Sequence, residues 1–369
     1  MSRLAYASVA LLGYTYVGYP VAVALLSALK PMTTARDTAY EPRVSVLIPV
    51  YNARAYVKPK LDSLLAQTYP KDKLEILLYS DASDDGSDEV IRAYADRGVR
   101  LIRGDARRGK PSALNVMRKE ATGEVFVLTD IRQVLSANAV RSLVDHLADP
   151  SVGCVSGNLE LVGGTGAGAY WRYENFIRSC EARFRGMVGV TGPLYAIRAS
   201  DFPAEVPADI ILDDMWIPLG LRLQGKSLVF EKDAVALDDA FDDDREKGRK
   251  VRTLAGNFQL FAKMPKLLSP VTNPSFFETF SHKLLRLAGP PLMAGAVLGT
   301  IEGLLTETNE AERARLKLLL GGELAFAALA ALGPRAGKLG QLARTFTMMN
   351  TAAVEGFVRF VRDSQKVTW

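Results

Sequence analysis

Residues 44–52 read Val44-Ser-Val-Leu-Ile-Pro-Val-Tyr-Asn52, an apolar run that ends in a polar turn. A run of this length is typical of a strand that is buried on both faces of a parallel sheet. From Val57 to Thr68, apolar side chains recur at helical spacing until Tyr69 and Pro70 interrupt the pattern. The sequence therefore predicts a strand at 44–50, followed by a helix that crosses back over the sheet.

The same alternation continues for three more strands. Apolar runs at 74–79, 99–103 and 125–128 predict the strands, and helical spacing at 90–95 and 111–119 predicts helices between them. Strands and helices in alternation indicate an α/β fold, with a mostly parallel sheet and helices on both faces. In such sheets, ligands bind at the carboxyl ends of the strands.

Polar residues follow directly after three of these strands. They are Tyr51 and Asn52 after the first, the loop 80–87 (Ser-Asp-Ala-Ser-Asp-Asp-Gly-Ser) after the second, and Thr129 and Asp130 after the fourth. Carboxylates, hydroxyls and turn backbone would meet at one edge of the sheet and form a candidate ligand site. The alternative is that these residues only cap helices and form turns, as in any α/β protein.

The composition excludes some classes of protein. The 369 residues are 48% hydrophobic and 24% charged, which is enough for a large core. Two cysteines and two histidines are too few for a disulfide framework or a Cys/His zinc site, so a bound metal would lie on carboxylate and phosphate oxygens. The net charge of +5 is too small to indicate whether the protein binds a phosphate-bearing partner or an anionic membrane surface. A protein that binds nucleic acid typically has a basic stripe interleaved with aromatic residues. The sequence shows no such stripe outside the segments that flank the candidate membrane spans described below, so nucleic-acid binding is not expected.

The N-terminal segment is long and apolar enough to cross a membrane. From Leu4 to Leu29 there is no charged residue, and about 20 apolar residues suffice to span a bilayer. A signal peptide is the alternative, but it needs a shorter apolar stretch and a more basic leader than the single Arg3. We therefore expect a transmembrane helix over residues 1–30.

Two weaker apolar segments lie at 287–305 and 316–332. Each carries one carboxylate and the first contains two prolines, so they predict either two spans or a kinked, re-entrant pair. A buried helical hairpin of a soluble protein is the alternative. The positive-inside rule places the central region and the C-terminus in the cytoplasm, because basic residues follow the first and last apolar segments: Lys30, Arg36, Arg43, Arg335, Lys338 and Arg344. Mixed apolar and basic residues at 258–286 and 334–369 are typical of interfacial helices.

Four motifs, taken in order, resemble those of family 2 glycosyltransferases with the GT-A fold. They are residues 46–52, the 80–87 loop, Gly109-Lys-Pro-Ser-Ala-Leu-Asn115 and Thr129-Asp130. The resemblance covers roughly residues 44–256, and the flanking segments resemble the membrane-integrated branch that makes bacterial polysaccharides and glycolipids. It implies an N-terminal transmembrane helix (1–30), a cytoplasmic GT-A catalytic domain (41–257), interfacial helices (258–286), two C-terminal transmembrane or re-entrant helices (287–333) and a C-terminal interfacial segment (334–369).

The resemblance implies a nucleotide-sugar site at the carboxyl ends of the strands. Asp81 matches the family's acidic residue that accepts the imide N–H of uracil in a UDP-sugar. Lys110 follows a glycine and would meet the ribose or the diphosphate, and a solvated loop lysine is the alternative. The expected donor-binding residues are Pro49, Tyr51, Asn52, Asp81, Ser83, Lys110, Asp130, Gly192 and Arg249.

The metal motif of the family is altered in this chain. Where the family has Asp-x-Asp after the fourth strand, this chain reads Asp130-Ile131-Arg132, and an arginine cannot coordinate a cation. Either Asp130 holds Mg²⁺ or Mn²⁺ together with waters and phosphates, or Arg132 itself neutralises phosphate charge. Of the two, we expect a metal at Asp130.

Asp213 and Asp214 match the family's acidic pair at the start of a helix. Inverting sugar transfer needs a carboxylate that takes a proton from the acceptor hydroxyl while its oxygen attacks the anomeric carbon. Asp214 matches that base, and Asp213 would either raise the proton affinity of its neighbour or only cap the helix. The alternative is a helix start with two aspartates and no catalytic role.

The last motif is also altered. Processive synthases carry Gln-x-x-Arg-Trp, whereas this chain has Arg249-Lys-Val-Arg252-Thr253. Arg252 would still stabilise the leaving diphosphate, but without the tryptophan a stacking platform for a growing chain is missing. One or a few transfers are therefore expected rather than processive synthesis. The run Asp242 to Asp244 predicts a mobile loop that gates the site.

Between these motifs, a Gly-rich link at 163–168 precedes a predicted helix at 170–185. On this helix, Glu174 would contact a sugar or pair with Arg178 at the helix surface. Residues 191–198 resemble the strand that lines the family's donor-sugar pocket, where Gly192 would permit a close approach of the sugar.

The resemblance therefore implies a multi-pass protein of the plasma (inner) membrane with its catalytic domain in the cytoplasm. Its function would be inverting transfer from a UDP-sugar to a lipid-linked or polysaccharide acceptor in bacterial surface polysaccharide or glycolipid synthesis. Membrane lipids are expected partners, and nucleic acid is not. The altered motifs leave two alternatives, a processive synthase and a catalytically silent scaffold of a polysaccharide assembly or export complex.

Overall fold

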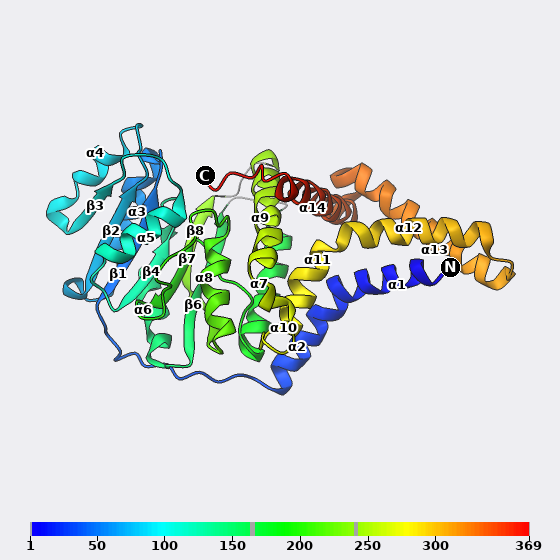
Figure 1. The fold of residues 1–369 in the computed structure, drawn as a ribbon, viewed down its shortest axis with the longest axis horizontal. Coiled ribbons are helices and arrows are strands. Elements are labelled where there is room, and N and C mark those ends of the chain that lie inside the picture. Colours follow the sequence, from blue (N-terminus) through cyan, green and yellow to red (C-terminus); the bar gives the residue numbers. More distant parts are fainter. Residues whose placement is uncertain (1, 163–166, 240–242, 369) are drawn as a thin grey trace. The chain divides into compact units, whose positions relative to one another are not determined.

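The computed structural model describes residues 2–162, 167–239 and 243–368. These residues divide into two compact units (Figure 1). All strands of the described residues belong to the first, which we call the sheet unit. The sheet unit consists of Ala24–Phe241, Leu260–Phe276 and Lys366–Trp369, and the helical unit of Met1–Val23, Asp242–Gln259 and Phe277–Gln365.

The described part of the sheet unit contains one eight-stranded mixed sheet. Its strands are β1 (Val44–Val50), β2 (Leu74–Ser80), β3 (Val99–Arg103), β4 (Val125–Thr129), β5 (Val134–Leu135), β6 (Val152–Val162), β7 (Leu194–Arg198) and β8 (Ser227–Asp239). The strand order is β3-β2-β1-β4-β7-β6-β8-β5. Strands β3, β2, β1 and β4 are parallel, as expected. Strand β7 is antiparallel to both β4 and β6, β6 is parallel to β8, and β5 is antiparallel to β8.

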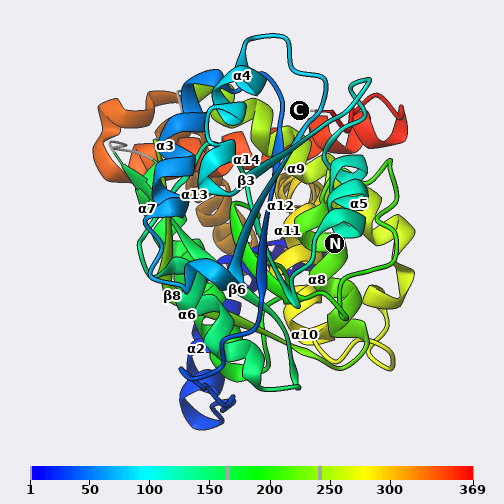
Figure 2. The ribbon, with the colours of Figure 1, turned by 90° about the vertical axis from the view of Figure 1, so that its left-hand side faces the viewer.

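Helices cover both faces of the sheet, which confirms the prediction. They are α3 (Arg54–Leu65), α4 (Ser87–Arg92), α5 (Lys110–Glu120), α6 (Ala139–Val144), α7 (Ala167–Phe184) and α8 (Asp213–Leu223). In Figure 2 the strands pass between α3 and α6 on one side and α5 and α8 on the other. Alternate side chains of β1 enter two separate cores, because successive residues of a strand point to opposite faces. Val46 and Val57 belong to one core, and Leu47 and Leu114 to the other.

The predicted strands at 44–50 and 99–103 are found with these bounds, and those at 74–79 and 125–128 extend by one residue. The apolar pattern of the sequence does not predict β6 and β8, which are the longest strands. Polar residues interrupt their apolar pattern at 156–158 in β6 and at 231–233 in β8. Hydrophobic periodicity does not reveal such strands, because pairing with the neighbouring strands, and not their own composition, places them in the sheet.

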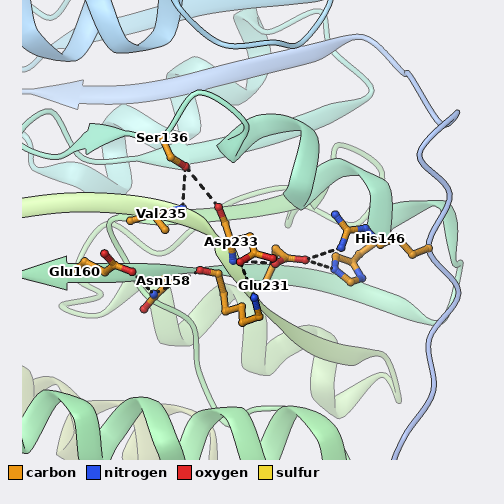
Figure 3. Close-up of polar contacts among 9 residues, drawn as sticks. Ser136, His146, Asn158, Glu160, Glu231, Asp233 and Val235 are labelled. Carbon is orange, nitrogen blue, oxygen red and sulfur yellow. Dashed lines mark hydrogen bonds and ion pairs between the residues drawn. The ribbon is translucent and has the colours of Figure 1, made fainter.

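Strand β8 has an irregular polar segment around Glu231 (Figure 3). The pairing of β6 with β8 shifts register there, between Phe230 and Val235. Glu231 Oε2 lies 2.9 Å from His146 Nε2, and Ser136 Oγ accepts a hydrogen bond from the Val235 N–H at 3.2 Å. Side chains of neighbouring turns thus satisfy polar groups that an irregular ladder leaves unpaired.

In its described residues, the helical unit contains helices and no strand. They are α1 (Ser2–Gly13), the first part of α2 (Tyr19–Leu29), most of α9 (Asp243–Lys263), the end of α10 (Phe276–Glu278), α11 (Leu285–Leu287), α12 (Gly289–Thr306), α13 (Glu310–Leu332) and α14 (Gly337–Val361). A Cβ atom added to Gly295 would lie 2.7 Å from Ser8 Oγ, and one added to Gly299 would lie 2.6 Å from Ala5 N. Two glycines four residues apart on α12 therefore let α1 approach closely, as small residues do between membrane helices.

Two stretches of the described chain are long and apolar enough to cross a membrane, namely Arg3–Leu29 and Glu310–Val361. A pair of helices, Phe276–Leu287 and Gly289–Thr306, meets the same test together, but it is bent by 62°. The first stretch matches the N-terminal span that the sequence predicts. The predicted segment at 287–305 lies in the bent pair, and that at 316–332 lies in the second stretch, which α14 continues to Val361.

Two loop predictions were wrong in part. Asp243 and Asp244 belong to the first turn of α9 and do not form a loop. Residues 167 and 168 of the predicted Gly-rich link begin α7. Asp242 and residues 163–166 lie outside the described residues.

Candidate active site

The loops after β1 and β2 are joined by hydrogen bonds. The Asn52 N–H donates to Ser83 Oγ at 3.1 Å, and the Asn52 side chain exchanges hydrogen bonds with Asp84, at 2.8 Å and 3.0 Å. Asn52 adopts a positive φ of 44°, a conformation that asparagine tolerates better than most residues. Asn52 and Ser83 were expected to bind the donor, and in this structure their polar atoms hold the two loops together.

Asp81 fixes the loop that leads into α5. Its carboxylate is fully buried and accepts hydrogen bonds from the backbone N–H groups of Arg108 and Gly109, both at 2.8 Å. An ionised carboxylate has about four acceptor positions, so two remain after these contacts. Gly109 adopts a φ of +87°, which a residue with a side chain rarely does. The sequence thus needs a glycine immediately before Lys110.

Tyr51 presents its ring next to the same loop. The guanidinium carbon of Arg107 lies 3.8 Å from the centre of the Tyr51 ring, close enough for a cation–π interaction. Pro49, by contrast, is buried inside β1 opposite Tyr79. Of these two expected donor-binding residues, Tyr51 therefore offers the accessible ring.

Lys110 is the first residue of α5 and lies between two carboxylates. Its Nζ is 2.9 Å from Asp130 Oδ1 and 3.2 Å from Asp213 Oδ2. Burial alone would lower the pKa of Lys110, but the carboxylates of Asp130, Asp213 and Asp214 outweigh burial and raise that pKa above its ordinary value. The side chain is only 17% exposed. The alternative of a solvated loop lysine is therefore wrong.

Asp213 and Asp214 occupy the first turn of α8, as the sequence predicts. Asp213 is 5% exposed, and Asp214 is half-buried. Burial and then the charge of Asp213 raise the pKa of Asp214 to about 6, against the opposing charges of Lys110 and Arg178. A carboxylate with this pKa is still ionised at neutral pH, and it is a stronger base than an exposed aspartate.

Gly192 leaves room for the carboxylate of Asp214. A Cβ atom added to Gly192 would lie 2.3 Å from Asp214 Oδ2. The preceding residue, Thr191, is held on both sides: its N–H donates to Ser156 Oγ at 2.8 Å, and its Oγ1 accepts from Arg178 Nη1 at 3.1 Å. The sequence suggested that Gly192 admits a sugar, and the structure places it against Asp214.

The side chains after Asp130 turn toward the end of β8. Arg132 Nη2 donates to Asp238 Oδ1, and Gln133 Nε2 donates to Asp238 Oδ2, both at 2.7 Å. Asp238 is buried, so Arg132 neutralises its charge and Gln133 satisfies its second oxygen with a hydrogen bond. Arg132 therefore holds the β4–β5 connection to β8 in this structure.

Sequence reasoning missed Lys60, a fully buried lysine of α3 beneath the site. Its Nζ donates to Thr129 Oγ1 at 2.6 Å and to the Gln133 carbonyl at 2.9 Å. Burial lowers the pKa of Lys60 to about 7, although the charge of Asp130 opposes this shift. The signal was present, because Lys60 shares the buried helix face of Val57, three residues earlier.

The donor set does not fit a divalent cation well. Within the described residues, no group of three or more His, Cys, Asp or Glu side chains is placed to hold a metal. Asp130 Oδ1 is already paired with Lys110, and Arg132 stands where a second carboxylate ligand would be needed. Mg²⁺ and Mn²⁺ prefer several oxygen ligands at about 2.0–2.2 Å.

Three other expected site residues need separate mention. Arg249 and Arg252 lie on α9, in the helical unit, and their assignment to the donor site stays a prediction. Glu174 is 5% exposed, so it lies below the helix surface, and both its contact with a sugar and its pairing with Arg178 stay predictions.

The fold and this site define a class of protein, the GT-A type glycosyltransferases. Residues 45–196 match the model of the family described as Glycosyl transferase family 2. A solved structure, the mannosyltransferase PcManGT from Pyrobaculum calidifontis in complex with GDP-Man and Mn²⁺, is similar with a TM-score of 0.77 and 26% identity. That similarity covers 98% of this chain and 99% of the other.

Curated relatives agree with this family. The glycosyltransferase AglE of Haloferax volcanii is 29% identical over 141 residues, which are 38% of this chain and 46% of AglE. WfgD of Escherichia coli, a UDP-Glc:alpha-D-GlcNAc-diphosphoundecaprenol beta-1,3-glucosyltransferase, is 25% identical over 119 residues, which are 32% of this chain and 46% of WfgD. The chain thus spans less than half the length of these relatives. It contains a family 2 glycosyltransferase domain with the GT-A fold.

Proposed function

We propose that the protein is an inverting glycosyltransferase that transfers a sugar from a nucleoside-diphosphate donor to a lipid-linked or polysaccharide acceptor. The observation that carries this proposal is the half-buried Asp214, whose raised pKa suits a general base. It lies in one cluster with Asp213, Lys110 and Asp130. Such a cluster offers a base for the acceptor and a cation for the leaving group.

In the proposed reaction, Asp214 takes the proton of an acceptor hydroxyl while its oxygen attacks the anomeric carbon. The bond between that carbon and the donor's diphosphate breaks, and the nucleoside diphosphate leaves with the electron pair. The Lys110 ammonium stabilises the charge that develops on the leaving group. Attack opposite the leaving group inverts the configuration at the anomeric carbon.

The donor is predicted to carry uracil, which Asp81 would bind through its free acceptor positions. The name of WfgD includes UDP-Glc, whereas the Pyrobaculum calidifontis structure contains GDP-Man. Guanine also presents N–H donors to a carboxylate, so the test includes both nucleotides.

The acceptor and the location are inferred from the helices and from one relative. The stretches Arg3–Leu29 and Glu310–Val361 support a multi-pass protein of the plasma membrane, and the positive-inside rule favours a cytoplasmic site. The name of WfgD includes a diphosphoundecaprenol acceptor, which supports a lipid-linked acceptor here. Thr253, in place of a tryptophan, favours one or a few transfers over processive synthesis.

The experiment measures nucleotide release by the detergent-purified full chain with a panel of UDP- and GDP-sugars. Asp214→Asn is expected to reduce kcat by at least about a hundredfold with the active donor. Asp96→Asn, at an exposed position outside the site, is the matched control and should leave kcat unchanged. Undiminished release by Asp214→Asn would refute the assigned base, and failure of every donor to bind would favour a silent scaffold.

A further inference from the structure

We infer that Lys110 takes the place of a divalent cation at the donor's diphosphate, so that donor binding and sugar transfer do not require a metal. The inference rests on the proposed function and concerns the same site. It is carried by three observations: the orientation of Arg132, the position of Lys110 between two carboxylates, and the anchoring of its loop by Asp81.

The first observation is that Arg132, at the second position of the Asp-x-Asp motif, cannot coordinate a metal ion. Arg132 is a cation itself, and its guanidinium is paired with the buried Asp238 at 2.7 Å. Gln133 donates to the other oxygen of Asp238. Both side chains are therefore turned to the end of β8, and a rotation of Arg132 away from it would leave a buried carboxylate without its cation, which is costly.

The second observation is that an ammonium group already lies where a cation would bridge the carboxylates. Lys110 Nζ is within 3.2 Å of both Asp130 Oδ1 and Asp213 Oδ2. A divalent cation bound to Asp130 Oδ1 would approach to about 2.0–2.2 Å and would repel the ammonium next to it. It would have to displace Lys110 from the carboxylate, whereas a diphosphate oxygen needs only one of the three N–H groups of the lysine.

The third observation is that the position of Lys110 does not depend on a ligand. Asp81 holds the preceding loop through the backbone N–H groups of Arg108 and Gly109. Arg107 of the same loop stacks on Tyr51. Arg107 and Arg108 thus belong to a loop that is anchored before the donor binds, and Lys110 follows it at the start of α5. Cations arranged in advance stabilise a leaving diphosphate without reorganisation.

The charge balance of the reaction needs no further reactant. The nucleoside diphosphate leaves with the electron pair of the broken bond, and the Lys110 ammonium donates hydrogen bonds to its oxygens. The proton of the acceptor stays on Asp214. The manganese of the Pyrobaculum calidifontis structure belongs to that protein, so the inference predicts a measurable difference between the two proteins.

The test is calorimetric binding of UDP and GDP to the full chain, with EDTA and with added Mn²⁺. We expect the same Kd in both conditions, within about twofold, for the nucleotide that binds. Lys110→Ala should weaken binding by at least about tenfold in both, because it removes a charge-assisted hydrogen bond. Lys119→Ala, an exposed lysine of the same helix, should bind as the wild type does, and Lys110→Arg should recover part of the affinity.

A second variant tests the motif directly. Arg132→Asp combined with Asp238→Asn restores Asp-x-Asp without placing two carboxylates together, and thermal unfolding checks that it folds. We expect Mn²⁺ to bind this double variant, as measured by electron paramagnetic resonance, and to leave the wild type unbound. Nucleotide binding by the wild type that disappears in EDTA would overturn the inference. Binding of neither nucleotide under any condition would instead refute the proposed function.

Discussion

The substitution Gly192→Ala tests whether the proposed base must occupy its observed position. The added Cβ would lie 2.3 Å from Asp214 Oδ2 and 3.1 Å from Asp214 Cγ. Carbon and oxygen atoms that are not bonded to each other lie at about 3.4–4.0 Å. The carboxylate must therefore move by about 1 Å or rotate away from Gly192.

A movement of this size is large for a proton transfer. Reacting groups are productive at about 3–3.5 Å, and a misplacement of 1 Å costs about a hundredfold in rate. We therefore expect kcat to fall by about a hundredfold. The KM for the donor should change little, since the groups around Lys110 and Asp81 are not displaced by the new methyl group.

The assay compares initial rates of nucleotide release for the wild type, Gly192→Ala and Gly220→Ala. Gly220 lies on α8 with Asp214, and an added Cβ there meets no other group within 4 Å. Its replacement should leave kcat unchanged and stabilise the helix by up to about 1 kcal/mol. A wild-type kcat for Gly192→Ala, with the protein folded, would refute the assignment of Asp214 as the base.

Two further predictions use the shifted pKa values. Because burial and the charge of Asp213 raise the pKa of Asp214 to about 6 in the free protein, kcat/KM should fall as the pH decreases through 6, and in Asp213→Asn the acid limb of the kcat/KM profile should lie at lower pH. An unmoved limb would contradict the assigned coupling. Burial lowers the pKa of Lys60 to about 7, so above that pH the unfolded chain binds more protons than the folded one, and stability should rise between pH 7 and 9. Lys60→Met should lack this rise in thermal unfolding, and an equal rise in both proteins would contradict it.

Much of the fold is predictable from the sequence because its strands are local apolar runs. Strand β1 and the polar turn at its carboxyl end can be located from nine consecutive residues, 44–52. Asp213 and Asp214 are likewise placed at a helix start by their match to the family's acidic pair. In each of these cases the deciding interactions lie within a few residues along the chain.

The contacts that set the chemistry could not be predicted in the same way. Arg132 pairs with Asp238, 106 residues later, and Gly192 faces a carboxylate that lies on another helix. A sequence pattern identifies both residues as unusual, but only the tertiary structure shows which group each one contacts. The motif at Asp130 therefore has two interpretations from the sequence, and the position of Lys110 is needed to show which charges surround Asp130.

Lys110 also links occupancy of the donor site to the strength of the base. Its charge lowers the pKa of Asp214, and it pairs with Asp213, whose charge raises that pKa. A diphosphate that draws the ammonium away would leave Asp213 less compensated and would add its own negative charge nearby, and both effects favour the protonated form of Asp214. The profile of kcat/KM reports groups of the free enzyme, and that of kcat reports the complex. The acid limb of kcat should therefore lie at higher pH than that of kcat/KM, whereas coincident limbs would show that Lys110 stays with its carboxylates when the donor binds.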